Sequence, residues 1–303
     1  MRLKPGRPDL SRYRDRFDVP EAKGARRVTF LGVSTLVLDD GESAIMTDGF
    51  FSRPGLLSVA ARKITPDRER VAAGLRLGGV DRLDAVVPVH AHFDHVMDSP
   101  LVAELTGARL AGDESALQVG VGHALPADRR DLLVEGAPVT YGSWTLTPFT
   151  GHHCPPDRYP GEITQPVIPP VKVGAYRCGR AWSLHVAHRG GDAALIVGSA
   201  GYVAGALAGV RADIAYLGVG QLGLLDEDYI ETYWTETVRA VGARRVVLIH
   251  WDDFFRPLDQ PLRALPYAGD DLDVSIRVID RLAAADGVTV HLPRLGVRED
   301  PWA

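Results

Sequence analysis

The chain has 303 residues, of which 46% are hydrophobic and 24% are charged, and its formal net charge at pH 7 is -5 with histidine counted as neutral. This composition is typical of a folded globular protein and excludes disordered, collagen-like and low-complexity chains. The mildly acidic balance argues against nucleic acid as a partner. Two cysteines, Cys154 and Cys178, are too few for a disulfide scaffold or a cysteine-rich zinc module.

The beginning of the chain differs from the rest. The first 26 residues mix arginine and aspartate without a clear period, so we expect an N-terminal extension over residues 1–26 and one domain over 27–303. The first 17 residues hold no signal-peptide core, and no later stretch reaches the 18 apolar residues of a membrane span. The sequence therefore predicts a cytoplasmic protein without a membrane span.

Strands and helices alternate through the first half of the domain. An Asp-Gly turn at 39–42, between β-rich segments, predicts a β-hairpin opening. A helix is expected from Thr65, as the N-cap, to Leu77, because Gly78 and Gly79 follow. The other elements expected here are strands at 28–31, 35–38, 43–47, 85–89 and 108–111, and short helices at 101–105 and 114–119.

A long loop interrupts the second half. Residues 154–171 contain six prolines, and a loop of this length usually carries function. A helix from Asp226 places Ile230, Trp234 and Val238 on one apolar stripe. The other elements expected here are a hairpin at 139–147, strands at 182–186, 193–197, 214–217, 245–249 and 288–292, and a helix at 274–284.

His90-Ala91-His92-Phe93-Asp94-His95, directly after the expected strand 85–89, is the most informative segment. Three imidazoles and a carboxylate within six residues suit a d-block cation such as zinc or iron. If His90 and His92 are extended, their side chains point to the same side, whereas Asp94 and His95 fall on the following turn. The segment therefore predicts a site for one metal ion or for two.

This segment resembles the His-x-His-x-Asp-His signature of the metallo-β-lactamase superfamily, and the resemblance runs from Val28 to about Leu292. Three further motifs are similar to the family's structural aspartate and to its next and last histidine motifs: Thr47-Asp48-Gly49, Gly151-His152-His153-Cys154-Pro155 and Ile249-His250-Trp251-Asp252-Asp253. The resemblance implies an α/β fold, a four-layer αββα sandwich with metals at one rim between the sheets. The helix expected at Thr65 to Leu77 and the closing His-Trp-Asp-Asp-Phe resemble the branch that contains ascorbate-6-phosphate lactonase and N-acyl-phosphatidylethanolamine phospholipase D.

The same resemblance implies two sets of metal ligands. His90, His92 and one histidine of the 152/153 pair would hold one ion, and Asp94, His95 and His250 would hold the other. We prefer His153, because His153-Cys154-Pro155 is closer to the family's His-Thr/Ser-Pro, and His152 stays the alternative. The expected cofactor is Zn²⁺, one ion or two, and the same ligands would also accept iron or manganese.

One position departs from the family. Val197-Gly198-Ser199-Ala200-Gly201 stands where the family has Gly-Asp-Thr/Ser-Gly, so Ser199 replaces the aspartate that bridges the two metals. Since a hydroxyl is a poor zinc ligand, we expect the Asp94 set to bind its ion more weakly. The residues that the resemblance places around the ligands are Asp48, Ser199, Tyr202 and Asp253.

The activity that the resemblance implies is hydrolysis of an ester, lactone or phosphodiester bond of a small molecule by a Zn-bound hydroxide, with Asp94 as the catalytic carboxylate that accepts its proton. Two alternatives stay open, an iron-dependent redox member of the same superfamily and a non-catalytic metal-binding module. Cys154 is expected to pack and not to act as a nucleophile, because no base with an orienting partner is evident beside it. The sequence does not exclude a homo-oligomer.

Overall fold

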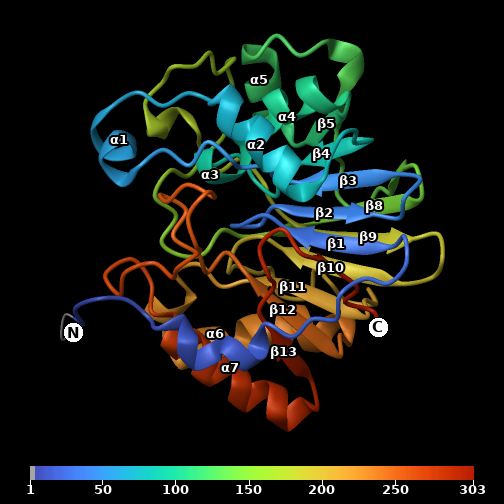
Figure 1. The fold of residues 1–303 in the computed structure, drawn as a ribbon, viewed down its shortest axis with the longest axis vertical. Coiled ribbons are helices and arrows are strands. Elements are labelled where there is room, and N and C mark those ends of the chain that lie inside the picture. Colours follow the sequence, from blue (N-terminus) through green and yellow to red (C-terminus); the bar gives the residue numbers. More distant parts are fainter. Residues whose placement is uncertain (1–3) are drawn as a thin grey trace.

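A computed structural model describes residues 4–303, and the first three residues of the predicted extension lie outside this range. Two seven-stranded sheets lie face to face in the middle of the molecule, and helices cover the outer face of each sheet (Figure 1). The predicted αββα sandwich is therefore confirmed.

The first sheet begins as an antiparallel meander and continues as parallel strands. Its strands are β1 (Arg27–Phe30), β2 (Leu36–Asp39), β3 (Ala44–Thr47), β4 (Ala85–Val87), β5 (Arg109–Gly112), β6 (Arg130–Leu132) and β14 (Arg298–Glu299). They lie in the order β14-β1-β2-β3-β4-β5-β6, and β3 through β6 run parallel. The helices on the outer side of this sheet are α2 (Arg68–Gly78), α4 (Ser99–Thr106) and α5 (Glu114–Gly122) (Figure 1).

The second sheet repeats this arrangement. Its strands are β7 (Val139–Tyr141), β8 (Trp144–Gly151), β9 (Ala181–His188), β10 (Ala193–Val197), β11 (Ile214–Gly218), β12 (Arg245–Ile249) and β13 (Thr289–His291), in the order β13-β12-β11-β10-β9-β8-β7. β10 through β13 run parallel. The covering helices are α6 (Glu227–Trp234), which continues as a π-helical turn over Thr235–Arg239, and α7 (Leu272–Asp286).

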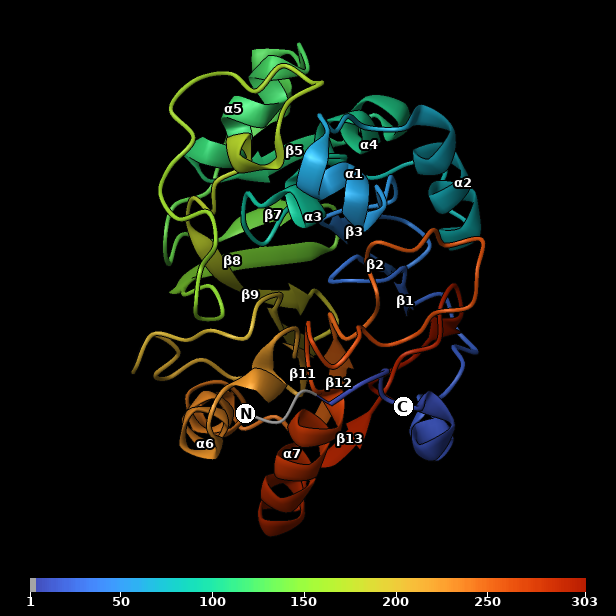
Figure 2. The same cartoon turned by 90° about the vertical axis from the view of Figure 1, so that its left-hand side faces the viewer.

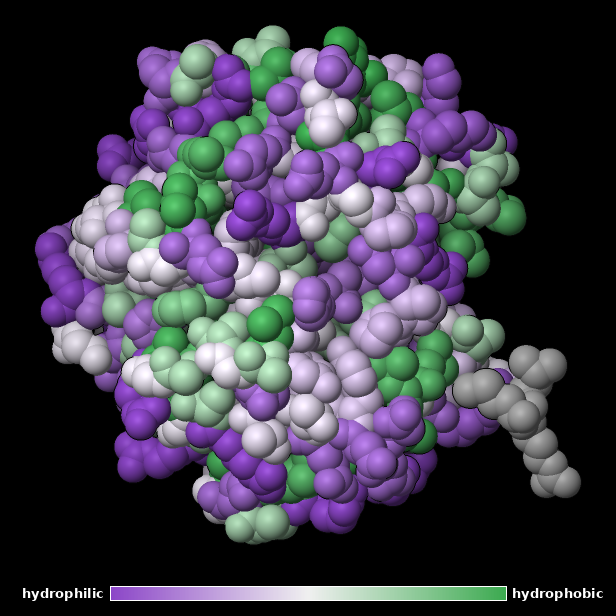
Figure 3. Space-filling view, turned by 180° about the vertical axis from the view of Figure 1, so that it is seen from behind, coloured by the Kyte–Doolittle hydropathy of each residue, from purple (hydrophilic) through white to green (hydrophobic). Residues whose placement is uncertain are grey.

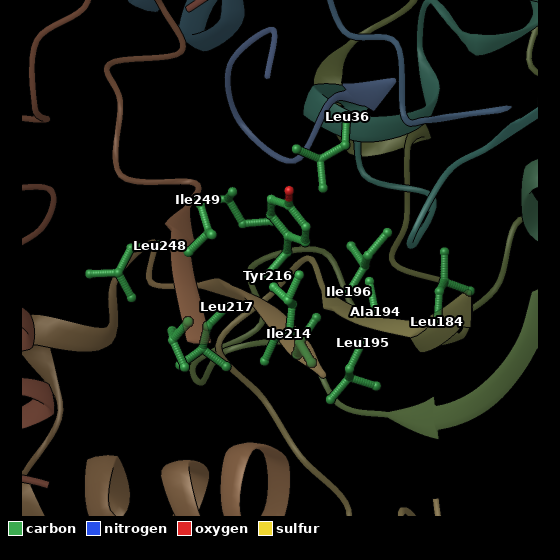
Figure 4. Packing of buried hydrophobic residues seen from close by; sticks show 14 of the residues in the cluster. Leu36, Leu184, Ala194, Leu195, Ile196, Ile214, Tyr216, Leu217, Leu248 and Ile249 are labelled. Atoms are coloured by element: carbon green, nitrogen blue, oxygen red, sulfur yellow. The ribbon is translucent and has the colours of Figure 1, made fainter. Parts of the chain in front are cut away.

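The main hydrophobic core lies between the two sheets. Side chains alternate between the faces of each strand, so every second residue of the central strands reaches this interface. Ile196 and Tyr216 point from the second sheet toward Leu36 of the first, whereas Leu195 points to the other side (Figure 4). Burial of these apolar side chains fixes how the sheets stack, and with it where their edges meet.

Strand ends of both sheets meet at one edge. The carboxyl ends of β3 and β4 lie there because these strands are parallel, and the carboxyl ends of β8, β10 and β12 lie there because they share one direction in the second sheet. Figure 2 shows this edge, with α1 (Leu56–Ala61), α3 (Phe93–Val96) and the loops that follow β12. Loops beyond the carboxyl ends of strands are the common location of ligand sites in α/β proteins.

The segment before β1 packs on the domain. Residues 10–16 form a 3-10 helix, Val19 is buried, and the Ala22 N–H donates to the Arg298 carbonyl. The sequence did not predict this 3-10 helix, because its mixture of arginine and aspartate has no apolar period. It also missed β14, which has only two residues.

Two helices beside the first sheet also differ from the expectation. The N-cap of α2 is Asp67 and not Thr65, because the Asp67 carboxylate accepts hydrogen bonds from the N–H groups of Glu69 and Arg70. The helix α1 was not expected, because its exposed apolar residues Leu56 and Leu57 leave no amphipathic pattern.

No helix among residues 4–303 is long and apolar enough to cross a membrane. On the face opposite that of Figure 1, hydrophobic residues are interspersed with hydrophilic ones (Figure 3).

We expect Leu36→Ala to lower the free energy of unfolding by about 2–5 kcal/mol, because it leaves a cavity between the sheets. Leu132→Ala is the matched control, since Leu132 is 47% exposed, and it should change stability by less than about 0.5 kcal/mol. Urea unfolding followed by circular dichroism measures both. Equal losses in the two variants would contradict the stacking described above.

Candidate metal centre

The structure brings six of the predicted ligands together in two adjacent groups. Potential ligand atoms of His90, His92 and His153 lie within 4.8 Å of one another, and so do those of Asp94, His95 and His250. The groups adjoin, because the rings of His90 and His95 are 3.9 Å apart between centroids. The alternative ligand, His152, is exposed and takes part in neither group.

In the first group, His92 and His153 each have one ring nitrogen in contact with an oxygen atom of the proline-rich loop. His90 Nε2 and His92 Nδ1 are 3.1 Å apart, and His92 Nε2 lies 3.2 Å from Asp157 Oδ1 and 3.3 Å from the Tyr159 carbonyl. His153 Nδ1 donates to the Cys154 carbonyl at 2.7 Å. When one ring nitrogen of a neutral histidine donates to an oxygen, the other ring nitrogen carries a lone pair that can bind a metal, as in metal-binding histidines.

In the second group, Asp48 orients His95. Its Oδ2 accepts from His95 Nδ1 at 2.8 Å, and its Oδ1 accepts from the Val89 N–H at 2.9 Å. His95 Nε2 is buried and has no hydrogen-bond partner among the described residues. A buried nitrogen without a partner is costly, and a bound cation would satisfy it.

The spacing around Asp94 fits a metal better than a hydrogen bond. Asp94 Oδ2 lies 3.7 Å from His95 Nε2 and 3.6 Å from His250 Nε2, which is too long for either to donate. Two ligands at about 2.1 Å from a tetrahedral ion would lie about 3.4 Å from each other. The residues present therefore fit a metal ion.

Burial sets the protonation states of these side chains. Burial and the neighbouring histidines hold the pKa of His90 well below its usual value, and burial lowers the pKa of His92 and that of His153, the latter to about 4. Burial alone would raise the pKa of Asp94, but His95 and His250 outweigh it and lower that pKa. Near pH 7 the three histidines of the first group are neutral and the Asp94 carboxylate is ionised, as metal ligands must be. For His95, burial lowers the pKa, but the Asp48 and Asp94 carboxylates outweigh burial and raise it.

A third set shares His92 with the first group and consists of His92, Asp157 and Cys178. Burial raises the pKa of the Cys178 thiol, so that the thiol stays protonated and is a weak ligand. The contact between His92 Nε2 and Asp157 accounts for this set without an ion.

Backbone strain concentrates at the same edge. Val33, Asp48 and His250 have φ between 53° and 59°, which non-glycine residues rarely adopt. The His250 N–H donates to the Val33 carbonyl at 2.7 Å, and the Val33 N–H donates to Asp252 Oδ1 at 2.8 Å. Asp252 in turn pairs with the fully buried Arg53 at 2.8 Å. This network holds His250 in a conformation that the chain would not otherwise prefer.

The residues expected around the ligands have different surroundings. Ser199 lies at the end of β10, and its hydroxyl accepts a hydrogen bond from the Cys154 N–H at 2.9 Å, next to His153. Tyr202 packs against Tyr229 of α6 and is not among the described residues that line the cavity below. Asp253 does line that cavity, where it pairs with two arginines.

A cavity of about 690 Å³ opens onto both groups through His92, Asp94 and His153. Much of its wall comes from α1 and from Phe254 and Phe255. The sequence did not predict these walls. It did predict that the proline-rich loop 154–171 would line the substrate groove, as Arg158 and Tyr159 do, but not the individual positions of Asp157 and Arg158. Asp157 stands only four residues beyond His153, which was the one available signal, but a proline-rich loop has no period that predicts its direction.

Comparisons with known proteins support the fold. No protein-family model and no curated protein matches the sequence. The structure is similar to a candidate metal-dependent hydrolase from Parabacteroides distasonis, with 14% identity and a TM-score of 0.54 over 92% of this chain and 99% of that chain. It is also similar to a possible metal-dependent hydrolase from Veillonella parvula, with 15% identity and a TM-score of 0.56 over 91% of this chain and 99% of that chain.

A third similar structure is CmlA, a diiron beta-hydroxylase from Streptomyces venezuelae. The two structures match with 11% sequence identity and a TM-score of 0.56. The match covers 92% of this chain and 54% of CmlA. The two-sheet sandwich and these similarities show that the chain has the metallo-β-lactamase fold, as the histidine motif predicted.

We expect Asp48→Asn to lower the affinity for Zn²⁺ by about 10- to 100-fold, because an amide has one acceptor oxygen, so that His95 Nδ1 and the Val89 N–H can no longer both donate to this side chain. Asp18→Asn is the matched control, since Asp18 accepts from His291 Nδ1 at 2.6 Å outside the two groups. Competition titration with a chromogenic chelator measures both affinities. The same affinity in the two variants would show that the Asp48 contact does not serve a metal site.

Proposed function

We propose that this protein is a metal-dependent hydrolase. In this proposal His90, His92 and His153 hold one ion, and Asp94, His95 and His250 hold a second. The observation that carries the proposal is the convergence of these six side chains from separate strand ends, two of them with their other ring nitrogen bonded to a carboxylate. Zn²⁺ suits this combination of imidazole and carboxylate, and Fe²⁺ or Mn²⁺ would also accept it.

The open cavity beside the groups supports catalysis over a purely structural metal site. When bound, zinc supplies a water of lowered pKa and polarises the bond under attack. The ionised Asp94 accepts a hydrogen bond from the attacking water and orients it. Phe93 and Phe254 wall the cavity beside Asp94 and keep bulk water away. The proposed substrates are esters, lactones or phosphodiesters of small molecules.

Iron-dependent redox chemistry is the second candidate, and the similarity to the diiron hydroxylase CmlA favours it. The two candidates differ in what they require. A hydrolase turns over with Zn²⁺ and without oxygen, whereas a hydroxylase requires iron, oxygen and a reductant. Metal content of the purified protein and turnover under nitrogen separate them.

The neighbouring histidines His152 and His153 provide the direct test of the proposed function. We expect His153→Ala to reduce the metal content by about one ion per chain and hydrolysis by about 100-fold or more, because it removes a ligand. His152→Ala should change neither, since His152 is exposed and lies outside both groups. Metal analysis by mass spectrometry and a panel of lactones, esters and phosphodiesters give the two readouts. Loss of both properties in His152→Ala alone would contradict the proposal.

Cys154→Ala tests whether the neighbouring thiol takes part. Burial raises the pKa of the Cys154 thiol to about 12, so that almost none of it is thiolate at neutral pH. We therefore expect Cys154→Ala to retain metal and to change kcat by less than about threefold. Full metal content with abolished turnover would instead make the sulfur the nucleophile.

A further inference from the structure

The cavity beside the metal centre has a size and a lining that limit what it can bind. Its volume of about 690 Å³ falls in the range of small-molecule sites. His92, Asp94 and His153 contribute to its wall, together with α1, the segments 253–255 and 263–269, and single residues from other parts of the chain, among them Arg7 and Arg158. An inference about its ligand rests on the proposed function, since the bond to be cleaved must reach Asp94.

One part of the wall is apolar and aromatic. The ring of Phe254 lies 6.3 Å from that of Phe93 and 4.4 Å from that of Phe255, between centroids. Leu56, at the start of α1, also lines the cavity although its side chain is 58% exposed. Such a wall gains free energy when it covers an apolar or aromatic group.

The other part of the wall carries an excess of positive charge. Three arginines line the cavity, Arg7, Arg158 and Arg263, against one carboxylate outside the metal groups, that of Asp253. Arg7 and Arg263 share this carboxylate, at 3.3 Å and 2.9 Å from its Oδ2. Arg158 forms no ion pair or side-chain hydrogen bond with any residue from 4 to 303, so its guanidinium is available to a ligand.

The backbone on both sides of Arg158 is held close to the metal centre. It lies between Asp157 and Tyr159, and both of these contact His92 Nε2, through a carboxylate oxygen and a backbone carbonyl. The loop that carries the arginine is therefore attached to a proposed metal ligand. A guanidinium at this place can form two parallel hydrogen bonds with a carboxylate or a phosphate.

We infer that the cavity selects an amphipathic substrate, whose anionic group pairs with Arg158 and whose apolar body lies against Leu56 and the phenylalanines. For an ester, water would add across the acyl C–O bond near Asp94 and give an alcohol, a carboxylate and one proton. The anionic group that pairs with Arg158 is a separate part of the molecule. Arg158 and Leu56 thus act on substrate selection and not on the bond that breaks.

Binding of non-hydrolysable probes to the zinc-loaded protein tests the role of Arg158. By calorimetry, we expect 4-phenylbutyrate and 4-phenylbutylphosphonate to bind about 10-fold more tightly than the neutral 4-phenylbutanol. Arg158→Met keeps the apolar stem of the side chain and should remove this preference. Arg62→Met, at an exposed arginine outside the cavity lining, should retain it. A preference that survives Arg158→Met would overturn the inference, because the anion would then bind to the metal or to another arginine.

Two neighbouring leucines test the apolar wall. Leu56→Ser should lower the affinity for all three probes by about threefold and leave the ratio of these affinities unchanged, because it removes apolar contact area. Leu57→Ser is the matched control, since Leu57 is 83% exposed and does not line the cavity among the described residues, and it should bind as the native protein does. Equal weakening in both variants, or in neither, would show that α1 does not contact the ligand.

Turnover separates this inference from the proposed function. With the native protein, we expect mono-4-nitrophenyl glutarate to be cleaved with a kcat/KM about 10-fold above that of 4-nitrophenyl butyrate, and Arg158→Met to abolish the difference through KM. Selective binding of the anionic probes without any hydrolysis would contradict the proposed function alone. Hydrolysis of both esters at equal kcat/KM, without selective probe binding, would contradict the inference alone.

Discussion

The Asp48 carboxylate connects the fold to the site. It lies at the end of β3, accepts the Val89 N–H just beyond β4, and accepts His95 Nδ1 from α3. One buried side chain therefore fixes the separation of two strand ends and the orientation of a proposed ligand. Because the carboxylate is fully buried, it depends on these donors, and removal of either one would leave one of its oxygens without a hydrogen bond. This contact orients His95 within the Asp94 group.

The second sheet reaches the same site through a different arrangement. His250 adopts a left-handed conformation after β12, and Val33 and the buried Asp252–Arg53 pair hold it there. Each such residue costs about 1–3 kcal/mol, so the sandwich has to provide that stability through its core. Position 201 requires a glycine in this conformation, because a Cβ there would lie 1.9 Å from the His152 carbonyl oxygen. Strain and close approach thus concentrate where the two sheets meet at the metal centre.

The sequence predicted the parts of this arrangement that follow a local pattern. One motif contains His90, His92, Asp94 and His95. Because a strand precedes this motif, its residues are expected at the edge of the sheet where the carboxyl end of that strand lies. It favoured His153 but left His152 open, because the choice between them depends on the register at which β8 ends. Asp157 and Arg158 were missed for a related reason, since only the tertiary path of the proline-rich loop returns them to His92.

Anomalous diffraction at the zinc absorption edge, from crystals grown with Zn²⁺, tests the central claim most directly. The account predicts one peak about 2.0–2.2 Å from a nitrogen of each of His90, His92 and His153, and a second, weaker peak at the same distances from Asp94, His95 and His250. The weaker peak is expected because Ser199 supplies no bridging carboxylate. A single peak between His92, Asp157 and Cys178, with nothing at the other two groups, would contradict it.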